Sequence, residues 1–486
     1  MGVTLRHICK ILPMAVCICL LSAMPARARF QNVIPRYDVA DSLLSSGVSS
    51  FETGKYEIAQ ALFDRVLNEF EPNNATTTAI ILAAKSAYRL GKFESARAYI
   101  SGFAGKYGSS KYVSEARFLD QLSFDASRFM ARKTTSLGII FSLDRDESGQ
   151  TQEIFNGVRL AVDQYNLEHS EQPVQMIFRD IDGGAASARR AIRELAAEGV
   201  SVIIGTLFSE EAIAAAEEAE LLQKVFVAPL ATNDQLVDNR SFTFQANPSM
   251  KVRGAAMARF AVNGLRLDSI AVILATDDRK ISERQSDGFL EEASQLGVTI
   301  NMVSVLPNEN ALYRLSDALG ADTLDLAKAV YIPLASRSPA ATAGAILSSL
   351  DRMNPNIRVI GNEGWQDLPQ VSHASSYLVT YGNEFWVDPA SDQYQAFART
   401  FRALAMAEPG RLGVTGFDVT NFVLNVLDQL ESEDGLNRQK ELRLVEAFRA
   451  QPLFQGLGLR IHFDGSNVNR ALFYHRYKDN ELTLIR

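Results

Sequence analysis

Residues 200–236 constrain the fold most, because they combine a strand, a turn, a helix and a second strand. Residues 200–204 are apolar and rich in β-branched side chains, which suits a strand buried on both faces of a parallel sheet. From Ser209 an alanine- and glutamate-rich pattern predicts a helix, and residues 225–227 predict the next strand. Open α/β sheets bind ligands beyond the carboxyl ends of their strands. The residues that follow these two strands are therefore predicted to line one wall of a cleft.

The first 28 residues have the three parts of a signal peptide. Arg6 and Lys10 are basic, residues 11–24 are mostly apolar, and Ala26 and Ala28 are the small residues that a signal peptidase requires. We expect cleavage after Ala28 and export to the periplasm. A retained membrane anchor is the alternative, but about 20 apolar residues are needed to span a bilayer and this run has about 14. All cysteines lie in this segment, so the exported chain would contain no thiol and no disulfide.

The chain of 486 residues, 47% of them hydrophobic, is long enough for several separate cores. Cleavage would remove three of its 49 basic residues and no acidic residue, so 46 Lys and Arg would face 57 Asp and Glu, a net charge of −11. This acidic balance disfavours nucleic acid and anionic membrane surfaces as partners.

A helical repeat follows a short linker, which is predicted over residues 29–40. The motif Gly54-Lys55-Tyr56-Glu57 recurs 37 residues later as Gly91-Lys92-Phe93-Glu94, with small and aromatic residues at helical spacing around both copies. The pattern over residues 41–131 resembles tetratricopeptide repeats, and a generic array of helical hairpins is the alternative. Stacked helical repeats offer surfaces for protein contact. We therefore expect a protein partner for this domain, and we expect deletion of residues 29–131 to leave solute binding intact.

From about residue 135 onward, strands and helices alternate in two successive series. Each series has apolar strand patterns separated by amphipathic helix patterns, which predicts repeated βαβ units. The sequence thus predicts an α/β fold with two doubly wound parallel sheets in tandem, preceded by an all-α domain. Further strands are predicted over residues 458–463 and 471–476.

Short motifs in this region occur in the order and spacing of a known family. They are Ser148-Gly149-Gln150 with Phe155-Asn156-Gly157, Arg179-Asp180, Val202-Ile203-Ile204-Gly205, Ala228-Pro229-Leu230-Ala231-Thr232-Asn233, Gly361-Asn362-Glu363-Gly364, Gly416-Phe417-Asp418, and Gly456 with Phe463-Asp464-Gly465. The region resembles type I periplasmic solute-binding proteins, especially the leucine-binding, branched-chain amino-acid receptors of ABC transporters. Together with the repeats, the layout is similar to that of the lipoprotein activators of peptidoglycan synthases.

The resemblance implies a periplasmic binding protein type I domain over residues 135–486, with two lobes and three hinge crossings. Lobe 1 would comprise about residues 135–247 and 382–458. Lobe 2 would comprise about residues 248–381 and 459–486.

The resemblance also implies a ligand-binding site for an amino acid, which needs hydrogen-bond donors for its carboxylate and an acid for its ammonium group. The donors would be Ser209, the backbone of Leu230, and Thr232, and Glu363 would pair with the ammonium group. Each residue has a structural alternative. Ser209 suits a helix N-cap, Thr232 suits a turn, and Glu363 could be an exposed residue at the end of a strand.

Two features depart from the family pattern. Residues 275–281 lack the aromatic-glycine pair that commonly covers the ligand from lobe 2, so one wall of the pocket is altered. Glu210 and Glu211 follow the predicted carboxylate-binding Ser209, and either one would repel an anion if it pointed into the cleft. If they lie along the helix surface instead, they favour the helix dipole.

The sequence shows no catalytic or metal-binding constellation. The four histidines after the signal peptide lie in unrelated contexts without metal-ligand spacing: His169, His373, His462 and His475. We therefore expect no enzyme activity, no metal and no cofactor. The predicted function is that of an exported solute-binding protein that closes on a small amphipathic ligand, first of all an amino acid, for an ABC-type transporter. The alternative is an envelope scaffold or regulator of peptidoglycan synthesis with a degenerate ligand cleft, and an enzyme is a weaker third hypothesis.

Overall fold

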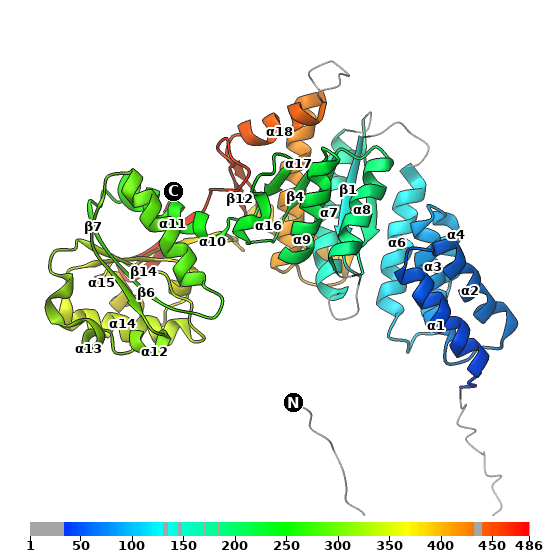
Figure 1. Ribbon diagram of the computed structural model, residues 1–486, viewed down its shortest axis with the longest axis horizontal. Helices are drawn as coiled ribbons and strands as arrows, with labels where there is room; N and C mark the ends of the chain where they lie inside the picture. The colour runs from blue at the N-terminus through cyan, green and yellow to red at the C-terminus, as the bar shows by residue number, and fades with distance from the viewer. Residues whose placement is uncertain are drawn as a thin grey trace, which may run out of the picture.

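The computed structural model describes residues 34–129, 135–143, 148–169, 172–182, 184–431 and 440–485. The predicted signal peptide lies outside the described residues, as do residues 29–33 of the predicted linker, and the last residues of that linker belong to the first helix, which begins at Asp38. Figure 1 shows an amino-terminal helical region beside a first α/β lobe, with a second α/β lobe on the far side of the first. The predicted fold class, a two-lobed α/β fold preceded by an all-α region, is confirmed.

The amino-terminal region repeats its turn geometry as well as its sequence. Gly54 and Gly91 both adopt a left-handed conformation, with φ of +75° and +70°, which favours glycine. The next residues, Lys55 and Lys92, have nearly identical backbone angles and each precedes a helix. The 37-residue sequence repeat is therefore a structural repeat, although the tetratricopeptide assignment stays a prediction. The helices are α1 (Asp38–Glu52), α2 (Tyr56–Glu69), α3 (Thr76–Arg89), α4 (Phe93–Ile100), α5 (Phe103–Lys106) and α6 (Val113–Phe129).

Lobe 1 is built on a five-stranded sheet whose strands are all parallel, in the order β2-β1-β3-β4-β5. The central strands are buried along their whole length, as their continuous apolar runs predict. The strands are β1 (Thr135–Phe141), β2 (Val174–Asp180), β3 (Val202–Gly205), β4 (Val225–Ala228) and β5 (Thr243–Gln245). The helices of this lobe are α7 (Ser148–Glu168), α8 (Ala185–Ala197), α9 (Ser209–Leu221), α16 (Asp392–Ala405), α17 (Arg411–Glu431) and α18 (Lys440–Ala450), with a 3-10 turn, η1 (Asp234–Val237).

Lobe 2 is built on a seven-stranded sheet in the order β14-β13-β10-β9-β8-β6-β7. Strand β13 runs antiparallel to both of its neighbours, β10 and β14, and the other neighbouring pairs are parallel. The strands are β6 (Ser269–Ala275), β7 (Thr299–Leu306), β8 (Ala329–Ile332), β9 (Arg358–Gly361), β10 (Thr380–Asn383), β13 (Phe473–Lys478) and β14 (Glu481–Ile485). The helical segments are α10 (Met250–Arg259), η2 (Phe260–Gly264), α11 (Ile281–Gln295), α12 (Glu309–Leu312), α13 (Leu315–Leu319), η3 (Ala321–Leu324), α14 (Pro339–Met353), η4 (Glu363–Trp365) and α15 (Val371–Ser376).

In the described part of the chain, the backbone passes between the two lobes three times. The first crossing joins β5 to α10 and the second joins β10 to α16. The third joins a two-stranded hairpin, formed by β11 (Phe454–Gln455) and β12 (Arg460–Ile461), to strand β13. After the hairpin, Asn467 donates hydrogen bonds to the carbonyl groups of Arg240, Ser241 and Thr243, so this segment still lies on lobe 1. The third crossing is thus several residues later than the predicted boundary at 458/459. The reason is that these residues follow β5 before they reach lobe 2.

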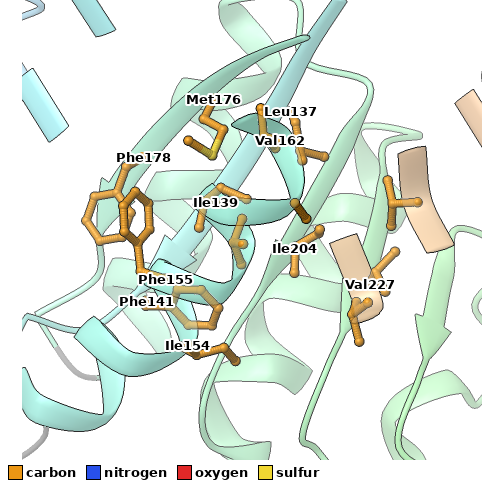
Figure 2. Packing of buried hydrophobic residues seen from close by; sticks show 14 of the residues in the cluster. Leu137, Ile139, Phe141, Ile154, Phe155, Val162, Met176, Phe178, Ile204 and Val227 are labelled. Carbon is orange, nitrogen blue, oxygen red and sulfur yellow. The ribbon is translucent and has the colours of Figure 1, made fainter. Parts of the chain in front are cut away.

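The helical region and lobe 1 share one hydrophobic core. Phe118 on α6 makes edge-to-face ring contacts with Phe155 on α7, at 5.1 Å between centroids, and with Phe178 on β2, at 6.1 Å. Figure 2 shows Phe155 and Phe178 side by side in the core of lobe 1. Deletion of residues 29–131 would uncover these rings, so the structure argues against the expectation that this deletion leaves solute binding intact.

A polar contact also joins the repeats to lobe 1. The guanidinium of Arg89, at the end of α3, is buried and donates a 2.5 Å hydrogen bond to the carbonyl of Asp180 at the end of β2. The same group lies 3.2 Å from the carboxylates of Asp180 and Asp182. Burial acts to raise the pKa of Asp180, but Arg89 and Lys85 outweigh it and lower this pKa to about 2. Burial and the charge of Asp180 raise the pKa of Asp182 to about 7.

Within the described part of the chain, no helix is both long enough and apolar enough to cross a membrane.

Candidate ligand-binding site

The carboxyl ends of both parallel sheets point toward the crossings between the lobes. Strand β5 leads directly into the first crossing and β10 leads into the second, and each is parallel to the strand before it in its sheet, β4 and β9 respectively. The loops after β3 and β4 in lobe 1 and after β9 in lobe 2 are therefore on the sides of the two sheets that face each other. This is where open α/β sheets bind ligands, and it holds all four predicted site residues.

Ser209 is the first residue of α9, directly after the turn that ends β3. The N-cap position belongs to Phe208, and no side chain caps the helix there. The hydroxyl of the half-buried Ser209 forms no hydrogen bond with any residue that the structure describes. Capping, the structural alternative for Ser209, is therefore not its role in this structure.

The two acids after Ser209 do not share one environment. Glu211 is buried and its carboxylate accepts a 3.1 Å hydrogen bond from the N–H of Gly184, just before α8. Glu210 is exposed on the helix surface. Glu211 is thus directed at a neighbouring helix, where its charge favours the amino-terminal end of that helix.

The loop after β4 carries Leu230 and Thr232. Its backbone is held by side chains from the end of β5: Gln245 donates a 2.8 Å hydrogen bond to the carbonyl of Ala231, and Asn247 donates a 2.9 Å hydrogen bond to that of Leu230. Asn233 supplies the turn chemistry, because its side chain accepts from the N–H of Gln235 at 2.8 Å. The half-buried hydroxyl of Thr232 makes no hydrogen bond to the described residues, so the turn does not account for it.

Glu363 lies on a rigid turn after β9. The side chain of Asn362 accepts from the N–H of Leu334 at 2.9 Å and donates to the carbonyl of the same residue at 3.1 Å, which fastens the turn to the end of β8. Gly361 is required here, because a Cβ at this position would lie 2.3 Å from the buried ring of Trp365. The packing fixes the backbone that presents Glu363, whose side chain is 34% exposed.

No sequence pattern indicates that Glu363 has a cation partner within the protein. Arg253, in the first turns of α10, donates from Nη1 to Oε1 of Glu363 at 3.2 Å and to Oε2 of Glu384 at 2.8 Å. Arg411 of α17 in turn donates to Oε1 of Glu384 at 2.6 Å. Arg253 and Glu384 are buried, with side-chain exposures of 7% and 6%. Only their positions, close to predicted lobe crossings, could have drawn attention to them.

Arg253 also connects the two lobes through the first crossing. Its Nη2 donates to Oδ1 of Asn247 at 3.0 Å, and Asn247 donates to the carbonyl of Leu230. A continuous hydrogen-bonded chain therefore runs from Leu230 in lobe 1 to Glu363 in lobe 2. We call the set Asn247, Arg253, Glu363, Glu384 and Arg411 the hinge network.

Burial and mutual charge determine the protonation of the two acids in the hinge network. Burial raises the pKa of Glu363, the positive charge of Arg253 opposes this rise, and the negative charge of Glu384 adds to it. Burial also acts to raise the pKa of Glu384, but Arg253 and Arg411 outweigh it and hold this pKa below the usual value. Glu384 is therefore the firmly ionised acid, and Glu363 is the one whose charge depends more on its surroundings.

The altered wall in lobe 2 is a tight polar turn. Asp277 follows β6 and its carboxylate accepts from the N–H groups of Arg279, Ile281 and Ser282 at 2.9–3.1 Å. This caps the start of α11 and leaves no aromatic side chain in the turn. Across the described residues, no three His, Cys, Asp or Glu side chains are grouped so that they could hold a metal ion.

Comparisons with known proteins agree with this architecture. The chain is similar to an ABC transporter protein of Rhodospirillum rubrum assigned to branched-chain amino acids, at 17% identity and a TM-score of 0.58, over 72% of this chain and 100% of the other. It is also similar to an ABC transporter substrate-binding protein of Sphaerobacter thermophilus, at 17% identity and a TM-score of 0.50, over 73% of this chain and 96% of the other. A search of curated proteins found no match.

A family model described as periplasmic binding protein matches residues 144–473, which is more than half of the chain. The match begins just before α7 and extends to the start of β13, so it spans both lobes and all three crossings. This chain belongs to the periplasmic binding protein family.

Proposed function

We propose that this protein is an exported solute-binding protein whose two lobes close on a small amphipathic ligand, an amino acid in the first instance, for an ABC-type transporter. Its family is a non-catalytic one that binds small molecules and works with the membrane components of ABC transporters, which implies a periplasmic location. The amino-acid ligand is the narrower part of the proposal, and the site residues carry it.

One observation supports the proposal most. Ser209 and Thr232 present hydroxyl groups that bond to no described residue, on loops at the carboxyl end of the lobe 1 sheet. Leu230 lies on the same loop as Thr232 and is tied through the hinge network to Glu363 on the opposite lobe. Donors on one wall and an acid on the other suit a ligand that carries a carboxylate beside a second polar group.

A thermal-shift screen of the full exported chain tests the proposal. The panel contains amino acids and, for each one, the corresponding carboxylic acid without the amino group. A ligand at about 100 times its Kd stabilises the folded state by about 2.7 kcal/mol, which gives a measurable rise in Tm. Stabilisation by at least one ligand, abolished when Ser209 and Thr232 are both replaced by Ala, would support the site. A Tm that no ligand raises would contradict it.

A second function, an envelope scaffold or regulator of peptidoglycan synthesis, is favoured by a different observation. The repeats share a core with lobe 1, so a protein bound to the repeats would hold the whole lobe. This function predicts that the screen yields no ligand and that loss of the protein changes peptidoglycan synthesis rather than solute uptake. Measurement of both in a deletion strain separates the two proposals.

A further inference from the structure

The acid that would receive a ligand ammonium group is already paired with a cation of the protein. Arg253 donates to Glu363 at 3.2 Å, and this contact joins residues 110 positions apart in the sequence. An ammonium group that approached Glu363 would therefore meet a guanidinium within a few ångströms. Like charges at such a separation oppose each other strongly, especially where little water screens them.

Arg253 is also held in place by every part of its guanidinium group. Its Nε donates to the carbonyl of Pro248 at 3.0 Å, and its Nη2 donates to Asn247 at 3.0 Å. Its Nη1 is shared between Glu363 and Glu384. The side chain is only 7% exposed, so it cannot turn toward solvent without breaking several buried hydrogen bonds.

The charges of the hinge network balance without a ligand. Glu363 and Glu384 contribute two negative charges, and Arg253 and Arg411 contribute two positive charges. A bound zwitterion would bring its ammonium group into a site where the acid has no surplus charge. A ligand with a carboxylate alone could bind the hydroxyl and N–H donors of lobe 1 and leave the network as it is.

We propose that Arg253 is a specificity-determining residue of the cleft: it occupies Glu363 as an internal cation, so the site selects organic carboxylates that lack an ammonium group over the corresponding amino acids. This inference rests on the proposed function as a solute receptor, and it names carboxylic acids without an amino group as the ligand class in place of the amino acid proposed first. Arg253 acts through Glu363 and the lobe 1 donors, and it does not itself need to touch the ligand.

Matched ligand pairs test the inference. Calorimetry on the full exported chain would compare leucine with 4-methylpentanoate, valine with 3-methylbutanoate, and phenylalanine with 3-phenylpropanoate, because the members of each pair differ only in the amino group. We expect the acid of a recognised pair to bind at least about tenfold more tightly than its amino acid. In Arg253→Gln we expect this ratio to fall by about tenfold or more. The ratio within a pair cancels any effect of the substitution on lobe closure.

Two further variants make the test specific. Arg259→Gln is the matched control, because Arg259 ends the same helix and pairs with Glu292 at 2.7 Å, away from the hinge network. It should leave the ratio unchanged. Arg253→Lys keeps the charge but loses the Nε and Nη2 donors that fix the side chain to Pro248 and Asn247, so it should give an intermediate ratio, and it replaces Arg253→Gln if that variant does not fold.

The outcomes are distinct. Two results would overturn the role of Arg253 and leave the proposed function standing. One is a wild-type protein that binds an amino acid as tightly as its matched acid. The other is an affinity ratio that stays at the wild-type value in both Arg253→Gln and Arg253→Lys. If no member of any pair bound to any variant, the proposed function would fail, and the inference would fail with it.

Discussion

Replacement of Phe118 by Ala tests whether the repeats and lobe 1 are one folding unit. The ring of Phe118 is 6% exposed and contacts both Phe155 and Phe178, which themselves meet edge to face at 5.5 Å. Truncation of a buried Phe to Ala removes its transfer free energy and leaves a cavity, and such changes cost about 3–5 kcal/mol. This is a large part of the roughly 5–15 kcal/mol that stabilises a typical domain.

The region that loses stability in Phe118→Ala distinguishes a shared core from two independent domains. If the core is shared, amides of α7 and β2 should lose protection against hydrogen exchange in Phe118→Ala, by about 100-fold for 3 kcal/mol. The control is Phe63→Ala, because Phe63 is fully buried in a separate cluster formed by α1, α2 and α3. That variant should lose protection in these helices and little in β2.

Peptide-level hydrogen exchange by mass spectrometry measures both variants in the full chain. The refuting result would be a Phe118→Ala protein whose loss of protection stops at the end of α6. In that case the ring contacts with Phe155 and Phe178 would contribute nothing to lobe 1, and deletion of the repeats would again be expected to leave the lobe intact.

Three other predictions concern the candidate site and the contact between the repeats and lobe 1. Glu363→Gln should weaken the binding of an amino acid at least about tenfold and tighten the binding of its matched carboxylate. The reason is that removal of a charge at about 6 Å changes the binding free energy by about 3 kcal/mol at an effective dielectric of about 20. Calorimetry that showed equal effects on both ligands would contradict this. Gly361→Ala should destabilise the protein by about 1–3 kcal/mol in denaturant unfolding, because its Cβ would clash with Trp365, and an unchanged midpoint would refute the argument. The pKa of Asp182 is raised to about 7 in the folded state, so its contribution to stability is full below its ordinary value near 3.8 and is lost as pH rises through 7. Asp182→Asn should remove this pH-dependent loss of stability, which is worth about 1–2 kcal/mol after allowance for exposure and for sharing of a proton with Asp180. Denaturant unfolding of the wild type and the variant across this pH range measures it, and identical profiles of stability against pH would count against the argument.

The local parts of the fold could be predicted from the sequence. Continuous apolar runs identified the buried strands of lobe 1, and the recurrence of Gly54-Lys55 as Gly91-Lys92 identified a repeat, in which the structure shows nearly the same backbone angles at Lys55 and Lys92. The predicted site residues also lie where the strand pattern placed them, at the carboxyl ends of β3, β4 and β9. Their role in ligand binding stays a prediction.

What could not be predicted depends on contacts between distant parts of the chain. Arg253 meets Glu363 across 110 residues and Glu384 across 131, and no local pattern relates them. The same holds for Phe118, whose helical spacing predicts a buried face but not that the face belongs to the next domain. The N-cap of α9 was a different error: a hydroxyl residue suited the position, but the helix begins at Ser209 and places Phe208 at the cap.

The shared core of the repeats and lobe 1 has a mechanical consequence. In the described part of the chain, lobe 2 is joined to lobe 1 by three backbone crossings and by the hydrogen bonds of the hinge network, whereas the repeats are fixed to lobe 1 by buried rings and by Arg89. A protein bound to the repeats would therefore hold lobe 1 in place, and the cleft would open and close by movement of lobe 2 relative to lobe 1. A fluorophore pair with one dye on α2 and the other on α14 would register each closure as a change in distance, whereas a pair on α2 and α9 would stay constant.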